Sequence, residues 1–202
     1  MTLRTAGSAA DTQHIAGLVK NKFLSRRMLL GRESPSVSQV AHYVKYLLRK
    51  NVNSNDGGEK FQASLICAGV DGNGNGGGPR IFAIAPGGSL YEEEHFCVSG
   101  SGSTLLLGML DQTVKEGLKL SKKEAIELVE KLLKLSIARD GSSGGLIRMV
   151  VMTTASTDDQ ENGGGGMEHR TVYPKMLGSG NDNDTSSTEA TALEGFAPPQ
   201  RR

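Results

Sequence analysis

A polar turn bracketed by glycines, lying between two apolar elements, most constrains what this chain can fold into. The turn covers residues 139–145 and reads Arg-Asp-Gly-Ser-Ser-Gly-Gly. It closes a long amphipathic helical pattern and is followed by Leu146–Met152, an apolar run typical of a strand. A turn held between two buried elements can place hydroxyls and a carboxylate beside a reacting group.

Four segments have apolar residues at the three- and four-residue spacing of amphipathic helices. The first has Ser8 as its cap, and the second begins after Pro35, where Ser36 and Gln39 form a capping-box pattern. Ser121 and Glu124 repeat that pattern at the fourth. The helices are predicted over residues 9–28, from Ser36 to about Leu48, over 104–115 and from Ser121 to Arg139.

Short apolar runs between these helices predict strands, with a glycine-rich hairpin loop after the first. Because helices and strands fall in separate blocks along the chain, the sequence favours an α+β fold over a parallel α/β fold. The strands are predicted over residues 63–70, 81–85, 95–98, 146–153 and 169–173.

Composition narrows the class of protein. The 202 residues give a net charge of only +1, from 23 basic and 22 acidic side chains, so no nucleic-acid footprint is evident. Cys67 and Cys97 each lie in an apolar run, which favours free thiols in a reducing compartment over a disulfide. Neither a membrane-length apolar run nor a signal-peptide core is found, so a cytosolic or nuclear location is expected. The four histidines are scattered, and neither a metal nor a cofactor is expected.

Five blocks in a fixed order resemble the proteasome β subunit family, and the likeness is closest to the subunit with caspase-like specificity. The resemblance spans about Arg4 to Met176 and is interrupted at glycine-rich loops, where insertions cost little. The blocks are Gly7–Gln13, Gly87–Ser89, Gly100–Thr104, Asp140–Val151 and His169–Pro174.

The resemblance implies a four-layer αββα sandwich of the N-terminal nucleophile hydrolase type. It implies stacked seven-membered rings with other proteasome α and β subunits, unfolded polypeptide as substrate, and a location in cytoplasm and nucleus. In active members a threonine attacks the scissile carbonyl with its own amine as base, helped by an aspartate and a lysine. No cofactor or metal is implied.

Roles for residues of this chain follow from the same resemblance. Gly7 matches the glycine whose amide stabilises the oxyanion. The polar cluster that supports the threonine is matched by Ser101, Asp140 and Ser143. Ala9 would lie near the backbone that pairs with the substrate, and Thr5 stands at the substrate-binding position where the caspase-like subunit has an arginine. Here the arginine, Arg4, lies one residue earlier, so the resemblance implies the acid preference only weakly.

The threonine, its aspartate and its lysine belong to strands that precede Gly7 in the family, and Thr2 and Thr5 lie too close to the first helix to replace them. We therefore expect an N-terminally truncated β-type domain over residues 1–177, inactive by itself, and a disordered tail over 178–202. The native product is expected to be a threonine-type endopeptidase that cleaves after acidic residues.

Four alternatives stay open at this point. The chain can be a non-catalytic assembly subunit of the ring, or a free-standing binding module that uses its serine-glycine loop. Without the family blocks, Asp140 is an ordinary residue after a helix. Residues 100–103 could cradle a phosphate at a helix start, although they lack the lysine and glycine spacing of such loops.

Overall fold

The computed structural model describes residues 2–30, 34–53, 60–71, 77–114, 120–153 and 166–174. These ranges contain four helices and six strands, all of the strand pairs antiparallel. In chain order they are β1 (Thr2–Gly7), α1 (Ala9–Leu30), α2 (Val37–Asn53), β2 (Ala63–Val70), β3 (Pro79–Ile84), β4 (Leu90–Glu93), α3 (Ser103–Thr113), α4 (Lys122–Arg139), β5 (Ile147–Met152) and β6 (Met167–Val172).

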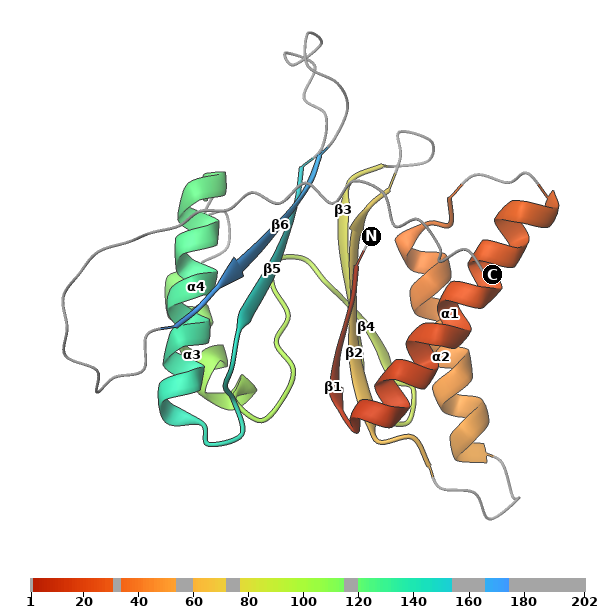
Figure 1. Cartoon of the computed structure of the whole chain (residues 1–202), viewed down its shortest axis with the longest axis horizontal. Helices are drawn as coiled ribbons and strands as arrows, with labels where there is room; N and C mark the ends of the chain where they lie inside the picture. The colour runs from red at the N-terminus through yellow and green to blue at the C-terminus, as the bar shows by residue number, and fades with distance from the viewer. Residues whose placement is uncertain are drawn as a thin grey trace, which may run out of the picture.

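The elements are arranged in layers, as Figure 1 shows. Helices α1 and α2 cover one face of a sheet with the order β1-β2-β3-β4. On the other side of that sheet lies the β5-β6 hairpin, followed by α3 and α4. The observed architecture is thus mixed α+β with antiparallel sheets, as the segregated sequence blocks predict.

One apolar core joins the first helix pair to the four-stranded sheet. Along β2 every second residue is buried, because side chains of a strand alternate between its two faces. Leu65 and Cys67 of β2 lie in this core with Ile15 of α1 and Val44 of α2. Burial raises the pKa of the Cys67 thiol to about 11, so Cys67 stays a neutral thiol. Both cysteines are free, Cys67 buried and Cys97 half-buried.

A second, smaller core lies between α3 and α4. Leu106 and Leu110 of α3 are buried against Leu132 of α4. The capping box predicted for α4 is present: Ser121 Oγ accepts the Glu124 N–H, and Glu124 accepts the Ser121 N–H at 2.8 Å. The two apolar clusters are separate, and each belongs to one helix pair.

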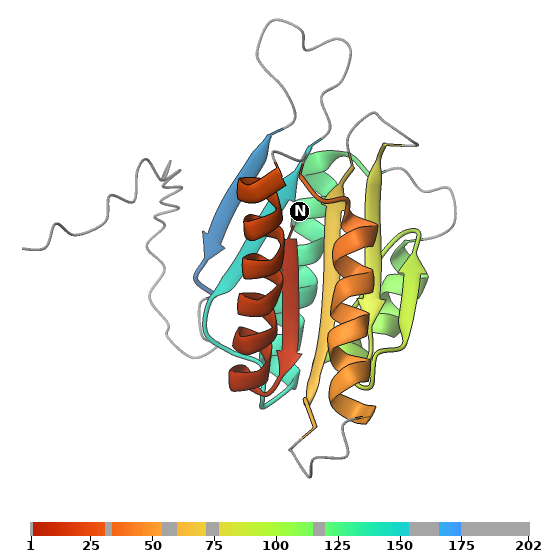
Figure 2. The same ribbon diagram turned by 90° about the vertical axis from the view of Figure 1, so that its right-hand side faces the viewer.

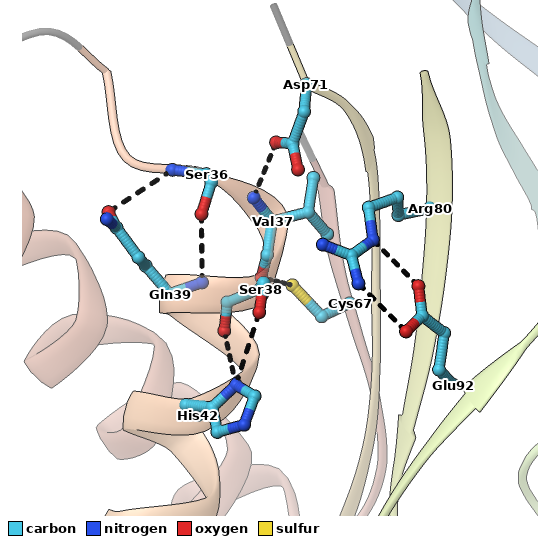
Figure 3. Close-up of polar contacts among 9 residues, drawn as sticks. All are labelled: Ser36, Val37, Ser38, Gln39, His42, Cys67, Asp71, Arg80 and Glu92. Carbon is cyan, nitrogen blue, oxygen red and sulfur yellow. Dashed lines mark hydrogen bonds and ion pairs between the residues drawn. The ribbon is translucent and has the colours of Figure 1, made fainter. Parts of the chain in front are cut away.

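The start of α2 is fixed to the sheet by polar contacts (Figure 3). Asp71, just after β2, accepts the Val37 N–H through Oδ1 at 2.7 Å, although 34 residues separate them. Ser36 and Gln39 form the reciprocal capping box predicted from the sequence. Asp71 therefore satisfies an orphan donor of the helix and complements its dipole from a different element.

Most of the predicted elements are confirmed, within a few residues at their ends. One is wrong: residues 95–98 do not form a strand, and the strand in this region is β4 instead. Phe96 and Val98 pack against the α3–α4 cluster, so their burial comes from helix contacts and not from a ladder. The acidic run of residues 92–94 is exposed, and the Glu92 carboxylate receives two hydrogen bonds from Arg80 of β3.

The two glycine-rich inserts and the predicted tail fall largely or wholly outside the described residues. The first insert is described at 71 and 77–79, and the second at 166. The tail predicted over 178–202 lies entirely outside, as does the predicted helix stop at Gly31.

Removing the Asp71 carboxylate tests how α2 is anchored. We expect Asp71→Ala to lower the free energy of unfolding by about 1–2 kcal/mol, because a charged acceptor at a helix start is lost. Asp111→Ala, at an exposed carboxylate on α3, is the matched control and should stay within about 0.5 kcal/mol of wild type. Urea unfolding followed by circular dichroism measures both. Equal stabilities for the two variants would contradict the anchoring role.

Candidate functional site

The candidate site is built around Asp140, the residue at which α4 ends. Its backbone N–H still donates to the Ser136 carbonyl at 2.8 Å, while its own φ and ψ of −106° and 114° are extended. The chain leaves the helix here, and the Asp140 carbonyl accepts the Ser143 N–H at 3.0 Å to close a turn. A short acidic side chain suits this position because it can also bond to the turn that follows it.

Two serine hydroxyls donate to the same oxygen of this carboxylate. Ser101 Oγ lies 2.5 Å from Asp140 Oδ2, and Ser143 Oγ lies 2.6 Å from it. The other oxygen, Oδ1, accepts the backbone N–H of Ser142 at 3.3 Å. Ser101 comes from the loop before α3, 39 residues away in sequence. The carboxylate therefore joins the loop before α3 to the turn that leads into β5.

The hydrogen bonds shift the protonation of this carboxylate. The Ser101 hydroxyl first, and the Ser143 hydroxyl next, hold the pKa of the Asp140 carboxyl below its ordinary value, with a smaller contribution from the Ser142 N–H. All three favour the ionised form, because an anion gains more from donors than a neutral acid does. Partial desolvation opposes them and does not reverse the direction. Asp140 is thus a carboxylate at neutral pH.

A fourth residue, Ser136, extends the cluster into the protein. Its side chain is buried, with 5 % of its surface exposed, and its Oγ lies 3.0 Å from Ser143 Oγ. Since Ser143 has one hydroxyl hydrogen and gives it to Asp140, Ser136 must be the donor in this pair. The close approach of the loop before α3 to α4 also depends on Gly102, because a Cβ there would overlap the Ser136 hydroxyl. Sequence reasoning missed both residues. A serine four positions before Asp140 on an otherwise apolar helix face was the available signal.

Gly7 ends β1 in a conformation that favours glycine. Its φ is +114°, and a Cβ at this position would overlap the carbonyl oxygen of Gln62. Ser8 donates its N–H to that same carbonyl at 2.9 Å. The backbone thus turns sharply from β1 into α1.

The serine loop lies against this end of the sheet. A Cβ built on Gly100 would be 3.8 Å from the Ala6 Cβ, an ordinary contact distance. Ser99 and Ser64, on β2, are joined through their hydroxyls at 2.6 Å. The structure therefore brings Ser101, Asp140 and Ser143 into direct contact, and it places their loop beside the strand that ends at Gly7.

For Ala9 and Thr5, the two residues expected to contact substrate, the structure describes the position in the fold but no contact with the serine cluster. Ala9 is the exposed first residue of α1, two positions after Gly7. The backbone of Thr5, in β1, pairs with that of Leu65 in β2, and the Thr5 side chain lies outside the described part. Arg4 is exposed and shares a face of the strand with Ala6, since strand side chains repeat every two residues.

A cavity of about 600 Å³ adjoins the serine cluster. Its walls come from the last turns of α4 and from the start of β5, and a volume of this size suits a small ligand or a few side chains of a polypeptide. Its lining residues are Leu133, Ser136, Ile137, Ser142, Ser143, Gly144, Leu146, Ile147 and Arg148.

The described residues contain no group of three or more His, Cys, Asp or Glu side chains placed to hold a metal ion. Among the helices in the described ranges, none combines the length and apolar character that crossing a bilayer requires.

Comparison with known proteins places the sequence of this chain in a family. The family model described as "Proteasome subunit" matches residues 1–152. The chain is 36 % identical over 145 residues to the probable proteasome subunit beta type-1 of Schizosaccharomyces pombe, covering 72 % of this chain and 58 % of the relative. It is 36 % identical to proteasome subunit beta type-6 of Arabidopsis thaliana, covering 72 % and 57 %. For proteasome subunit beta type-1 of Saccharomyces cerevisiae the identity is 35 %, covering 72 % and 61 %.

The chain therefore belongs to the proteasome subunit family. Within that family it is a β-type subunit, as the names of these relatives and the identity to them indicate. It spans about three fifths of the length of these curated relatives.

The lowered pKa of Asp140 can be tested directly. We expect its side-chain carboxyl carbon to titrate below the ordinary aspartate range by NMR, and Ser101→Ala to move the midpoint upward. Ser142→Ala is the control, because only its backbone N–H contacts Asp140. Since the folded-state pKa lies below the unfolded value, these bonds stabilise the fold above the ordinary carboxyl range, and that contribution is lost as the pH falls through the lowered pKa. An unchanged midpoint in Ser101→Ala would contradict this assignment.

Proposed function

We propose that the complete gene product is a threonine-type endopeptidase subunit of the proteasome core particle. In this proposal residues 1–177 form a β-type domain of the N-terminal nucleophile hydrolase fold, with helix layers outside two sheets. The layer order of the described elements supports that assignment. The nucleophilic threonine is supplied by a segment outside residues 1–202, so the chain by itself cleaves no peptide.

The observation that carries the proposal is the shared acceptor Asp140 Oδ2. Because Ser101 and Ser143 both direct their only hydroxyl hydrogen to this oxygen, Ser101 keeps its oxygen lone pairs free to accept from another group, and Ser143, which already accepts from Ser136, keeps one. Next to an ionised carboxylate, such acceptors favour a protonated amine or a donating hydroxyl. They can therefore orient a threonine amine and stabilise it when it takes up a proton, which is the support role that the family resemblance assigns to them.

The remaining roles in the proposal follow the family resemblance. The Gly7 amide stabilises the oxyanion, and the backbone near Ala9 pairs with the substrate as an added strand. Thr5 occupies the substrate-binding position at which the caspase-like subunit has an arginine, and the preference for an acidic side chain before the scissile bond is supported by the family resemblance alone. The partners proposed are other α and β proteasome subunits in stacked rings, in cytoplasm and nucleus, with unfolded polypeptide as substrate. No cofactor is needed for this chemistry.

A second candidate function is a non-catalytic β subunit that contributes only to assembly. One observation favours it: the described cluster contains no pairing of a nucleophile with a basic group. Ser101 and Ser143 donate to a carboxylate that is already ionised and whose pKa is lowered, which makes it a poor base. Measured peptidase activity of the complete subunit separates the two candidates.

Substitutions in the cluster of Ser101, Asp140 and Ser143 test the catalytic role. They are made in the complete subunit, assembled in its particle. We expect Asp140→Asn and Ser101→Ala each to lower kcat/KM for a fluorogenic peptide by roughly 100-fold, because the proton transfers lose their positioned acceptors. Ser142→Ala, whose hydroxyl is outside the cluster, should retain wild-type kcat/KM. Full activity in Asp140→Asn, in particles of normal composition, would contradict the support role proposed for Asp140.

The acid preference is tested with two peptides that differ only in glutamate or tyrosine before the cleaved bond. We expect Thr5→Arg to raise the ratio of kcat/KM for the glutamate peptide to that for the tyrosine peptide by about tenfold or more, since a charge pair with the glutamate is gained. Arg4→Ala, which removes a cation from the opposite face of the same strand, is the control and should leave this ratio unchanged. An unaltered ratio in Thr5→Arg would remove position 5 from the specificity pocket.

A further inference from the structure

Ser136 carries one of the two buried polar side chains in the described part of the chain, and Thr12 carries the other. A buried hydroxyl costs free energy unless it is hydrogen-bonded. The Thr12 hydroxyl donates to the Ala9 carbonyl of its own helix at 3.0 Å, a local bond that a helix readily offers. The Ser136 hydroxyl is bonded to the side chain of Ser143, seven residues later. The reason for its burial therefore lies in the cluster around Asp140.

A closed ring of hydrogen bonds joins Ser136 to Asp140 and Ser143. The Ser136 carbonyl accepts the Asp140 N–H at 2.8 Å. Asp140 Oδ2 accepts the Ser143 hydroxyl at 2.6 Å, and Ser143 Oγ lies 3.0 Å from Ser136 Oγ. Because the Ser143 hydrogen is directed to the carboxylate, Ser136 supplies the hydrogen of the last bond. The Ser143 hydroxyl is thus held from two sides.

The loop before α3 packs against the same hydroxyl. A Cβ built on Gly102 would overlap Ser136 Oγ and would lie 3.4 Å from Asp140 Oδ2. Ser136 therefore contacts every segment of the cluster: its own helix, the loop before α3 and the turn that follows Asp140.

The bond from Ser136 changes what the Ser143 hydroxyl can do. A hydroxyl that accepts a hydrogen bond becomes a stronger donor through its own hydrogen, so Ser136 strengthens the bond from Ser143 to Asp140. It also occupies one of the two lone pairs of Ser143 Oγ. A single direction is left from which a further group can donate to Ser143.

We propose that Ser136 is a positioning residue of the peptidase site, whose buried hydroxyl donates to Ser143 and so fixes the direction from which Ser143 accepts the threonine amine. Ser136 acts through Ser143 and takes no part in the proton transfers itself. The inference rests on the proposed function, because that function supplies the amine that Ser143 orients.

Titration of Asp140 in the full chain tests the hydrogen-bonded ring independently of activity. We expect Ser136→Ala to raise the pKa of the Asp140 carboxyl, measured by NMR, by less than Ser143→Ala does, since donation from Ser143 is weakened but not lost. In a Ser143→Ala background, adding Ser136→Ala should have no further effect, because the residue through which Ser136 acts is gone. An unmoved pKa in Ser136→Ala, or an equal shift in both backgrounds, would overturn the proposal.

Thr12→Val is the matched control, because it removes the other buried hydroxyl and keeps the shape of the side chain. Thr12 belongs to α1 and Ser136 to α4, and these helices lie on opposite sides of the four-stranded sheet; Figure 2 shows α1 in front of the sheet and α4 behind it. Thr12→Val should leave the pKa of Asp140 at its wild-type value. A shift as large as that of Ser136→Ala would mark a general effect of losing a buried hydroxyl and would overturn the specific role.

Kinetics of the complete subunit, assembled in its particle, test the role in the reaction. We expect Ser136→Ala to lower kcat for a fluorogenic peptide by roughly tenfold with KM unchanged, since a misdirected acceptor slows proton transfer without weakening substrate binding. Ser142→Ala should keep the wild-type kcat. A wild-type kcat in Ser136→Ala, or a change in KM alone, contradicts a positioning role.

Failure of this inference is distinguishable from failure of the proposed function. A complete wild-type subunit that cleaves no peptide removes the proposed function, while the pKa of Asp140 in the full chain still decides whether Ser136 acts through Ser143. An active wild-type subunit whose kcat is insensitive to Ser136→Ala overturns the positioning role alone.

Discussion

One carboxylate holds the candidate site together. Asp140 stands where α4 ends, and it receives one hydroxyl from a loop 39 residues earlier and another from the turn three residues later. Because each serine has a single hydrogen to donate, these bonds fix where its lone pairs point. Burial of Ser136 beneath the cluster, and the lack of a side chain at Gly102, allow the three segments to come this close. The chemistry proposed for the subunit depends on this arrangement.

The cluster lies at the junction of two separately packed parts. One apolar core belongs to α1, α2 and the four-stranded sheet, and the other to α3 and α4. Ser99 bonds to Ser64 on the first part, while Ser101, two residues later, bonds to Asp140 on the second. The serine loop is therefore held from both sides, and its geometry is determined by the relative position of the two parts. Such support from two rigid elements is what preorganisation of a catalytic group requires.

Sequence signals that span a few residues predicted most of the helices and strands. Features that depend on contacts between distant segments were not predicted. The capping boxes at Ser36 and Ser121 gave correct helix starts because the bonds involved span three residues. Residues 95–98 were wrongly predicted as a strand, since a short apolar run cannot reveal whether it pairs in a ladder or packs on helices. The roles of Ser136 and Gly102 appear only when distant segments meet. Asp140 taken alone was an ordinary turn residue, and the family resemblance suggested its partners.

Hydrogen–deuterium exchange of Asp140→Ala tests most directly whether this carboxylate couples the segments. We expect amides of residues 100–103 and of 141–145 to exchange faster together, although the substitution lies next to only one of the two segments. In an Asp111→Ala control, both segments should keep wild-type rates. Faster exchange restricted to 141–145, with 100–103 unchanged, would contradict the coupling on which the proposed site depends.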